Sequence, residues 1–288
     1  MGVDDHNATR TYEMTDTLDH HRRRSEFIRR LVQESHDVPL QTHHRQPTPK
    51  TIVQFWNDLE NLPEDVEECI DSWRIWSNGG FSHELYDEGR AKSFISASLS
   101  VRHQKAFERC YHPAMQSDYF RLCYLLTQGG CYVDADDVCS SVSLDVLFDD
   151  GRLKVQPLCY DLASGTMVPS SVFLRDDAFS ADWIFYFNNN PLIASAQHPV
   201  IELAVSRSTH LLEATGADVL PEIQETTGPG NLSRSIFEFG TTSEHLHSEL
   251  LVLRDWDSVA VSKWPLSYRD DARNWRLSNQ KEFRRATE

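Results

Sequence analysis

A helix, a pair of glycines and a short apolar strand that ends in aspartates follow one another from Ser117 to Asp137. This stretch reads S-D-Y-F-R-L-C-Y-L-L-T-Q-G-G-C-Y-V-D-A-D-D. We expect Gly129 and Gly130 to end the helix, because glycine adopts the left-handed conformation of a helix C-cap at little cost. The strand then carries its last carboxylates to its end, where solvent and a ligand reach them.

Asp134 and Asp136 stand one residue apart at the end of this strand and predict a site for a hard cation. Mg²⁺ and Mn²⁺ take oxygen ligands, and proteins commonly hold such ions through one or two carboxylates together with substrate phosphates. Two carboxylates therefore favour a metal ion whose shell is completed by a diphosphate. On the preceding helix, Asp118 and Arg121 stand at i and i+3 and project from one face.

Each of these features has a simpler explanation when it is taken alone. Acidic residues at a strand end often form only a solvated turn, and an Asp/Arg pair on a helix is often an exposed ion pair of little energetic weight. Their joint occurrence with Gly129, Gly130, Tyr132 and Trp56 favours a functional site.

The full pattern S-D-x-x-R-x-x-x-L-x-x-x-G-G-x-Y-x-D-x-D resembles the DXD sugar transferases of glycosyltransferase family 32. It is also similar to the catalytic core of clostridial glucosylating toxins and to initiating mannosyltransferases. The resemblance implies that Asp134 and Asp136 bind the divalent ion and, through it, the donor diphosphate. It implies that Asp118 and Arg121 hold hydroxyls of the donor sugar, so these four residues are the candidate catalytic residues. Tyr132 matches the pattern as well, and it joins Ala135 in the predicted donor-binding set.

A second segment with this resemblance begins at Pro49, where P-K-T-I-V-Q-F-W is similar to the family's opening strand P-K-x-I-H-x-x-W. The family's Trp lies by the nucleotide base, which implies that role for Trp56. Val53 stands where the family usually has His, so the chain departs from the pattern there. A helix with S-W at positions 72–73 and a short strand around 84–86 are expected to follow.

The second half carries weaker resemblances. One is N-N-N-P-L-I-A-S-A-Q-H-P at 188–199, and another is T-T-G-P-G at 226–230. The latter predicts a loop that enters a helix, where glycine allows close approach and free amides favour an anion such as a diphosphate. Gly228 is therefore a predicted donor-binding residue, although an ordinary turn and cap explains the same letters.

The late region from Glu244 to Trp264 is less specific. On a strand His245 and His247 would face the same side, so His247 is a predicted third metal ligand. The S-K-W run that ends at Trp264 resembles an element that closes the site in such families, which makes Trp264 a predicted donor-binding residue. A surface histidine and a packed tryptophan are the simpler alternatives.

The expected fold is α/β, with a mostly parallel Rossmann-like sheet of the GT-A type and flanking helices. Residues 1–46 form a polar N-terminal extension, in which 15–34 has helical character and a basic run. This helix packs on the domain or meets an acceptor or an anionic membrane. Residues 47–288 form one glycosyltransferase domain, with the nucleotide-sugar half at about 47–141 and the acceptor half at about 142–288. Strands are expected at 153–158, 167–174 and 183–187, and a helix at 198–215.

The composition excludes several other classes of protein. The 288 residues suffice for one large domain, and the formal net charge of −16 opposes binding to nucleic acid because a polyanion would be repelled. No run of 18 apolar residues and no apolar signal core occur, so we expect a cytoplasmic protein without a membrane span. The six cysteines lack C-x-x-C spacing and are expected to be free thiols.

These observations and the resemblance predict transfer of a hexosyl group from a UDP- or GDP-linked sugar to an acceptor hydroxyl, with Mn²⁺ or Mg²⁺ as cofactor. The resemblance implies retention of the anomeric configuration. The acceptor is left open among a glycan, a lipid, a small molecule and a protein. Two alternatives are a metal-dependent phosphohydrolase, which also uses aspartates at strand ends, and a non-catalytic nucleotide-sugar or carbohydrate-binding protein.

Overall fold

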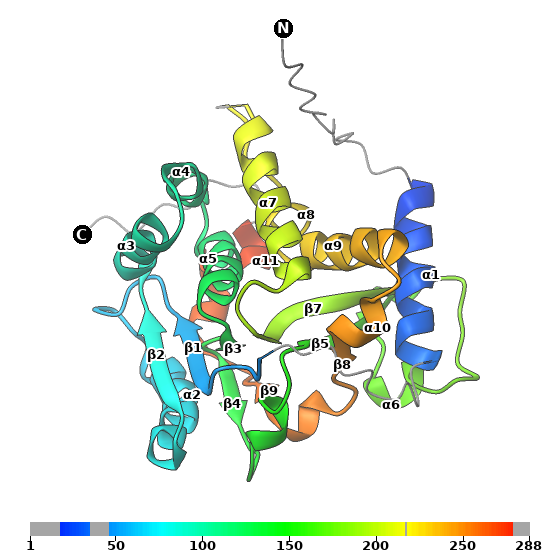
Figure 1. Cartoon of the computed structure of the whole chain (residues 1–288), viewed down its shortest axis with the longest axis horizontal. Helices are drawn as coiled ribbons and strands as arrows, with labels where there is room; N and C mark the ends of the chain where they lie inside the picture. Colours follow the sequence, from blue (N-terminus) through cyan, green and yellow to red (C-terminus); the bar gives the residue numbers. More distant parts are fainter. Residues whose placement is uncertain (1–17, 35–45, 217, 279–288) are drawn as a thin grey trace, which may run out of the picture.

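The computed structural model describes residues 18–34, 46–216 and 218–278, in which helices surround a central sheet (Figure 1). The helices are α1 (Leu18–Glu34), α2 (Glu64–Arg74), α3 (Glu88–Ser98), α4 (Val101–Glu108), α5 (Pro113–Thr127), α6 (Ser170–Phe173), α7 (Pro199–Ala214), α8 (Ile223–Thr226), α9 (Pro229–Thr242), α10 (Leu246–Glu249) and α11 (Trp275–Ser278). The strands are β1 (Thr51–Phe55), β2 (Ser82–Tyr86), β3 (Gly130–Tyr132), β4 (Asp137–Cys139), β5 (Leu153–Asp161), β6 (Thr166–Met167), β7 (Trp183–Ala194), β8 (Leu250–Val252) and β9 (Ala260–Ser262).

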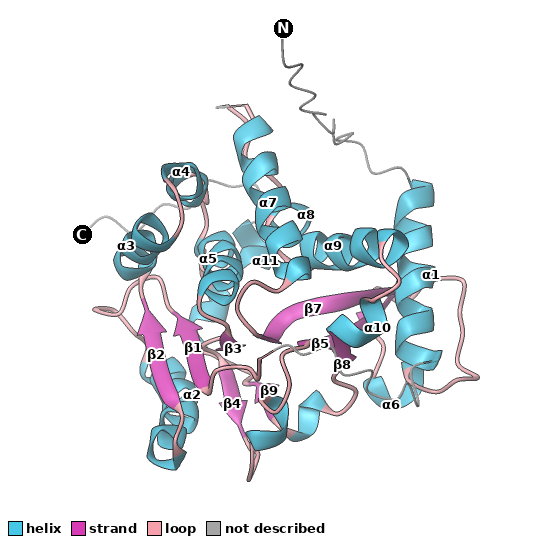
Figure 2. Cartoon of the chain, viewed as in Figure 1, coloured by secondary structure: helices cyan, strands magenta, loops and turns pink. Residues whose placement is uncertain are grey.

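The central sheet has the order β2-β1-β3-β7-β5-β6, and β8 pairs with β5. β1 is parallel to β2 and β3, whereas β7 is antiparallel to β3 and β5 (Figure 2). β4 and β9 form a separate pair beside it. The predicted α/β fold with flanking helices is confirmed, and the first half of the sheet has the predicted parallel arrangement. Among the described residues, no helix is both long and apolar enough to cross a bilayer.

The central strands are buried on both faces. Val53 of β1 and Tyr132 of β3 enter a large core that includes residues of α5, α7 and α9. Their neighbours Ile52 and Cys131 enter a second core on the other face, together with Trp73. Successive side chains of a strand point to opposite faces, so β1 and β3 hold both layers in place. The six cysteines are free, as predicted.

Helix α1 packs into the large core through Ile28, Leu31 and Val32. The Ser25 hydroxyl accepts a hydrogen bond from the Phe185 amide of β7 at 2.9 Å. Of the two predicted roles for this helix, packing on the domain is therefore the one observed. Residues 15–17 of the predicted helix lie outside the described residues.

The predicted strand at 167–174 is wrong beyond its first residue. β6 ends at Met167, and the turn of helix α6 follows Pro169. Proline lacks an amide hydrogen for a strand ladder and has the φ angle of a helix start, so it directs the chain into a helical turn. The predicted strands at 153–158 and 183–187 and the helix at 198–215 are confirmed, the second as part of the longer β7.

Gly129, which follows α5, and Gly130, the first residue of β3, both have positive φ angles, as predicted for a helix end. Gly130 has φ +116°, and a Cβ atom added there would lie 2.8 Å from the Thr51 carbonyl oxygen. Thr51 belongs to β1, which is parallel to β3. Glycine at 130 therefore lets β3 start directly beside β1.

We expect Gly130→Ala to lower the free energy of unfolding by about 2 kcal/mol or more, because it adds both backbone strain and a steric overlap. Gly216→Ala is the matched control, since nothing lies within 4 Å of a Cβ atom added at that position. Urea unfolding of both variants measures the difference. Equal stability of the two variants would contradict a steric requirement for glycine at 130.

Candidate active site

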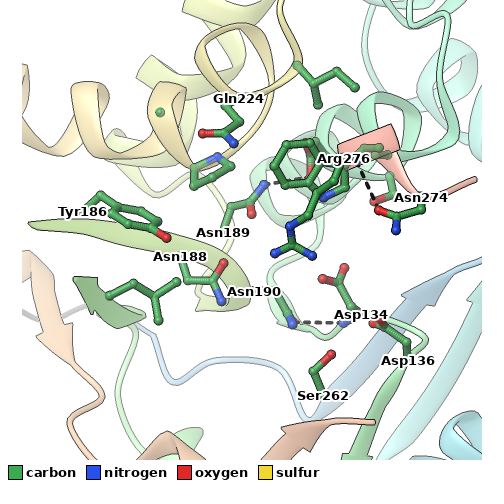
Figure 3. A pocket seen from close by; sticks show the side chains of 18 of the residues that line it. Asp134, Asp136, Tyr186, Asn188, Asn189, Asn190, Gln224, Ser262, Asn274 and Arg276 are labelled. Carbon is green, nitrogen blue, oxygen red and sulfur yellow. Dashed lines mark hydrogen bonds between the residues drawn. The ribbon is translucent and has the colours of Figure 1, made fainter. Parts of the chain in front are cut away.

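A cleft of about 1050 Å³ opens at the carboxyl end of β3 (Figure 3). Its walls come from α1, α5, β5, β7, α8 and the segment 262–276. Asp134, Ala135 and Asp136 follow β3 and line the cleft, whereas Asp137 begins β4 and is buried. The fold therefore brings the predicted strand-end carboxylates to a cavity, as expected for an α/β sheet.

The Arg121 guanidinium of α5 joins the acidic residues at this end of the cleft. Its Nη2 donates to Asp134 Oδ1 at 2.8 Å and to Ser117 Oγ at 2.7 Å, and it lies 3.0 Å from Asp118 Oδ1. Its Nη1 donates to the Asn189 carbonyl at 2.7 Å. Arg121 is only 2% exposed, so these ion pairs are largely shielded from water.

Two asparagines of β7 hold the same acidic residues from the opposite side. Asn189 Nδ2 donates to Asp118 Oδ1 at 2.8 Å. Asn190 Oδ1 accepts from the Asp134 amide at 2.9 Å, and its Nδ2 donates to Asp137 Oδ2 at 2.8 Å. Figure 3 shows Asn189 and Asn190 facing the cleft from β7. Each amide thus fixes one part of the aspartate cluster.

The segment 262–276 contacts Asp136 through two side chains. The Tyr268 hydroxyl donates to Asp136 Oδ2 at 2.7 Å, and Arg269 Nη2 contacts the same oxygen. Arg269 Nη2 also donates to Ser262 Oγ at 3.1 Å. The ring of Trp264 lies 4.5 Å from the Arg269 guanidinium carbon. Tyr268 and Arg269 therefore hold Asp136 in place, as Arg121 does for Asp134.

Burial and mutual repulsion disfavour the charged forms of these carboxyls. Burial raises the pKa of Asp118 to about 6; the neighbouring Arg121 opposes the rise and Asp134 adds to it. Burial also raises the pKa of Asp134, again against Arg121. Burial and the neighbouring Asp136 and Asp134 carboxylates hold the pKa of Asp137 well above its usual range. A cation bound here would relieve this repulsion.

The residues present fit a hard cation that is shared with a substrate. In the part of the chain that the structure describes, no three His, Cys, Asp or Glu side chains gather around a common metal position. Asp134 and Asp136 nevertheless line the cleft, and behind them Asp137 Oδ1 is a buried carboxylate oxygen without a hydrogen-bond donor. An all-oxygen donor set suits Mg²⁺ or Mn²⁺, which take further ligands from substrate phosphates and water.

Three further predicted residues lie at the cleft or beside its acidic end. Trp56 is 8% exposed and lines the cleft, and its Nε1 has no hydrogen-bond partner. Ala135 packs in the same small core cluster as Trp56. Gly228 precedes α9, and a Cβ atom added there would lie 3.2 Å from Asp118 Oδ2. Their contact with a donor stays a prediction.

Three other predicted residues do not line the cleft. Tyr132 is fully buried, and its ring packs against the Arg121 guanidinium, whose carbon lies 4.2 Å from the ring centre. Trp264 is 64% exposed and packs against Arg269. The expected strand around His247 is wrong, because His247 lies on the exposed side of α10 while Leu246 fills the core.

His247 is also at the wrong end of the sheet for a metal ligand. α10 leads into β8, whose Leu250 pairs with Leu153 at the start of β5. The cleft takes its β5 residues from Leu158 onward. The structure therefore does not bring His247 to Asp134 and Asp136, and we do not propose it as a ligand.

Four residues that contact the aspartates directly, although they are distant in the sequence, were not predicted as site residues. Asn189 and Asn190 lie in the segment 188–199, whose resemblance assigned them no role. The three consecutive asparagines in a buried strand were the only sequence feature that pointed to a site there. Tyr268 and Arg269 lie in a polar stretch without a pattern, and only the folded chain brings them to Asp136.

The raised pKa of Asp118 predicts a pH-dependent stability. The unfolded chain releases this proton near the ordinary pKa of 3.8 and the native state only near 6, so the native state binds more protons between these values. The free energy of unfolding should therefore fall by ~2 kcal/mol, relative to Asp118→Asn, as the pH rises from 4 to 6. Urea unfolding at several pH values measures this difference. Parallel curves for the two proteins would contradict it, and Asp149→Asn, an exposed change, should follow the wild type.

Comparison with known proteins points to the same region. Residues 63–151 match the family model described as the glycosyltransferase sugar-binding region containing a DXD motif. A segment of 92 residues is 27% identical to an uncharacterized glycosyltransferase of Acanthamoeba polyphaga mimivirus, and it covers 32% of this chain and 36% of that protein. The chain thus spans about a third of the length of this curated relative.

A solved structure, the PaToxG glycosyltransferase, aligns over 88% of this chain and 92% of its own with a TM-score of 0.46 and 15% identity. The family match contains Asp118, Arg121, Asp134 and Asp136, and it confirms the resemblance drawn from their spacing. Residues 63–151 are thus similar to the sugar-binding region of DXD-containing glycosyltransferases.

Proposed function

We propose that the protein transfers a hexosyl group from a nucleotide diphosphate sugar to an acceptor hydroxyl in the cleft. The observation that carries this proposal is the pair Asp134 and Asp136 at the cleft end of β3, backed by Asp118 and Arg121 of α5. The match of this segment to the sugar-binding region of glycosyltransferases supports it.

Asp134 and Asp136 would hold Mg²⁺ or Mn²⁺ in this proposal. When bound, the cation offsets negative charge on the donor diphosphate, including the charge that develops as it leaves. The asparagine side chain at 190 keeps the Asp134 backbone in place through its 2.9 Å hydrogen bond. That contact fixes the carboxylates before a substrate arrives, which lowers the cost of assembling the site.

Asp118 is the residue we assign to the donor sugar. Its Oδ1 is held by Arg121 and Asn189, while its Oδ2 has only a 3.4 Å contact from the Thr227 hydroxyl. Asp118 Oδ2 therefore retains capacity to accept a hydrogen bond from a sugar hydroxyl. Arg121 has a supporting role, since its guanidinium already serves two carboxylates.

Arg276 is the cation we assign to the diphosphate. It is exposed, lines the cleft, and pairs with no carboxylate among the described residues. Figure 3 shows Arg276 on the cleft side that faces Asp134. Trp56 offers the nucleotide a ring and an unsatisfied Nε1 donor at the same end of the cleft. Retention of configuration rests on the resemblance alone and is tested by NMR analysis of the product anomer.

Donor binding should raise the melting temperature only when a divalent cation is present. At a donor concentration 100 times Kd, the stabilisation is about 2.7 kcal/mol, or roughly 5–10 °C for a chain of this size. A panel of UDP- and GDP-sugars with and without Mn²⁺ identifies the donor. Release of the nucleoside diphosphate, rather than phosphate, separates a transferase from a phosphohydrolase.

Asp134→Asn and Asp136→Asn should remove the Mn²⁺-dependent stabilisation while leaving a folded protein. Asp149→Asn is the matched control, because Asp149 is exposed and lies outside the cleft. Normal Mn²⁺-dependent donor binding in either of the first two variants would overturn the assignment.

Arg276→Ala should weaken binding of the nucleoside diphosphate about tenfold and of the nucleoside monophosphate much less, because the contact is with the added phosphate. Arg276→Lys should recover part of the loss. Isothermal titration with both nucleotides measures the two affinities. An equal loss for both nucleotides would show that Arg276 acts elsewhere in the cleft.

A further inference from the structure

Four apolar or aromatic side chains form one wall of the cleft. In the antiparallel pair β5/β7, Leu158 lies opposite Tyr186 and Tyr160 lies opposite Ile184. Directly paired residues point to the same face of a sheet, and all four are half-buried and line the cleft. We call these four residues the acceptor wall.

The opposite face of the same strands is already used by the core. Cys159, Phe185 and Phe187 alternate with the acceptor wall and are buried in the large core. An antiparallel sheet with one face on the core usually turns polar residues to the other face. Here the second face is apolar too, within a cavity, which is typical of a surface that a ligand covers.

The polarity of this wall changes with distance from the aspartates. Asn190 contacts Asp134, Asn188 lines the cleft next, and Tyr186 and Ile184 follow along β7. At about 3.3 Å per residue, the path from Asn188 to Ile184 covers roughly 13 Å. On the side of the sheet, a ligand along this path meets the amide of Asn188 at its inner end and the acceptor wall farther out, while Gln224 and the Arg24–Glu225 ion pair line the cleft from α8 and α1.

The apolar surface continues to the rim of the cleft. Met167 of β6 pairs with Tyr160 and is 45% exposed, and Leu162 beyond β5 is 59% exposed. Both line the cleft. The Tyr186 hydroxyl donates to Met167 Sδ at 3.5 Å, so the acceptor wall continues into this rim without a gap, and an extended alkyl chain would contact both. Figure 3 shows Arg276 and Asn274 across the cleft from Tyr186.

We propose that the acceptor is an amphiphile, whose hydroxyl-bearing head lies near Asn188 and whose alkyl chain lies along the acceptor wall toward Met167 and Leu162. This inference rests on the proposed function and narrows its acceptor from the four open classes to a lipid. The Asn188 side-chain oxygen and its second amide hydrogen supply hydrogen bonds to the head, since its Nδ2 otherwise donates only to Gln156 Oε1 at 3.2 Å, while the wall buries the chain.

The test is isothermal titration of the full chain with methyl, butyl, hexyl and octyl β-glucoside, each below its micelle concentration, in the presence of Mn²⁺ and the nucleoside diphosphate that the protein binds. We expect Kd to fall about fourfold for each methylene that the wall buries. A Kd that does not depend on chain length would overturn the proposal. Phenyl β-glucoside binding as tightly as octyl β-glucoside would overturn it as well, in favour of an aromatic acceptor.

Ile184→Thr should reduce the ratio of methyl to octyl Kd by about fivefold or more, because it replaces part of the wall with a hydroxyl. Ile75→Thr makes the same chemical change at an exposed residue outside the cleft and should leave the ratio unchanged. Equal ratios in these two variants would contradict the assigned wall.

The melting shift that the donor causes tests the proposed function separately from the amphiphile inference. Ile184→Thr should keep the Mn²⁺-dependent melting shift with the nucleotide sugar, since the residue lies away from the aspartates. If no donor binds to the wild type, the proposed function fails. If the donor binds and chain length has no effect on Kd, only the amphiphile inference fails.

Discussion

The buried guanidinium of Arg121 is the interaction on which the acidic end of the cleft depends. Arginine presents five donors in a rigid fork, and here they reach Asp118, Asp134, Ser117 and the Asn189 carbonyl. These groups belong to α5, to the residues after β3 and to β7, so one cation ties three elements together. Loss of the guanidinium would leave the buried Asp118 carboxylate without its counter-charge, which costs about 3–5 kcal/mol in buried pairs.

The acidic end of the cleft was predictable because its determinants are local in sequence. Asp118 and Arg121 share a helical face, Gly130 lets the next strand start beside β1, and Asp134 and Asp136 follow that strand. A helix, a tight break and a strand fix one another's directions over a short distance. Their side chains therefore converge in the structure as the spacing predicts.

The supporting residues Asn190 and Arg269 were not predictable, because their positions depend on contacts between distant parts of the chain. Asn190 reaches Asp134 only after β7 pairs with β3, and Arg269 reaches Asp136 across 133 residues. For His247 the error is of another kind, because the sequence pattern predicted a metal ligand that the structure does not bring to the aspartates. A two-residue spacing is meaningful on a strand, but Leu246 turns inward on a short helix and leaves His247 at the surface.

The docking of α1 has a consequence for the order in which the molecule is assembled. Its apolar residues Ile28 and Val32 belong to the large core, and Ser25 bonds to Phe185, 160 residues later. During synthesis α1 leaves the ribosome before β7 does, so its apolar face stays unpacked until β7 has been made. Contacts this distant in sequence slow folding. Helix α1 therefore completes its contacts only after a strand made 160 residues later is available.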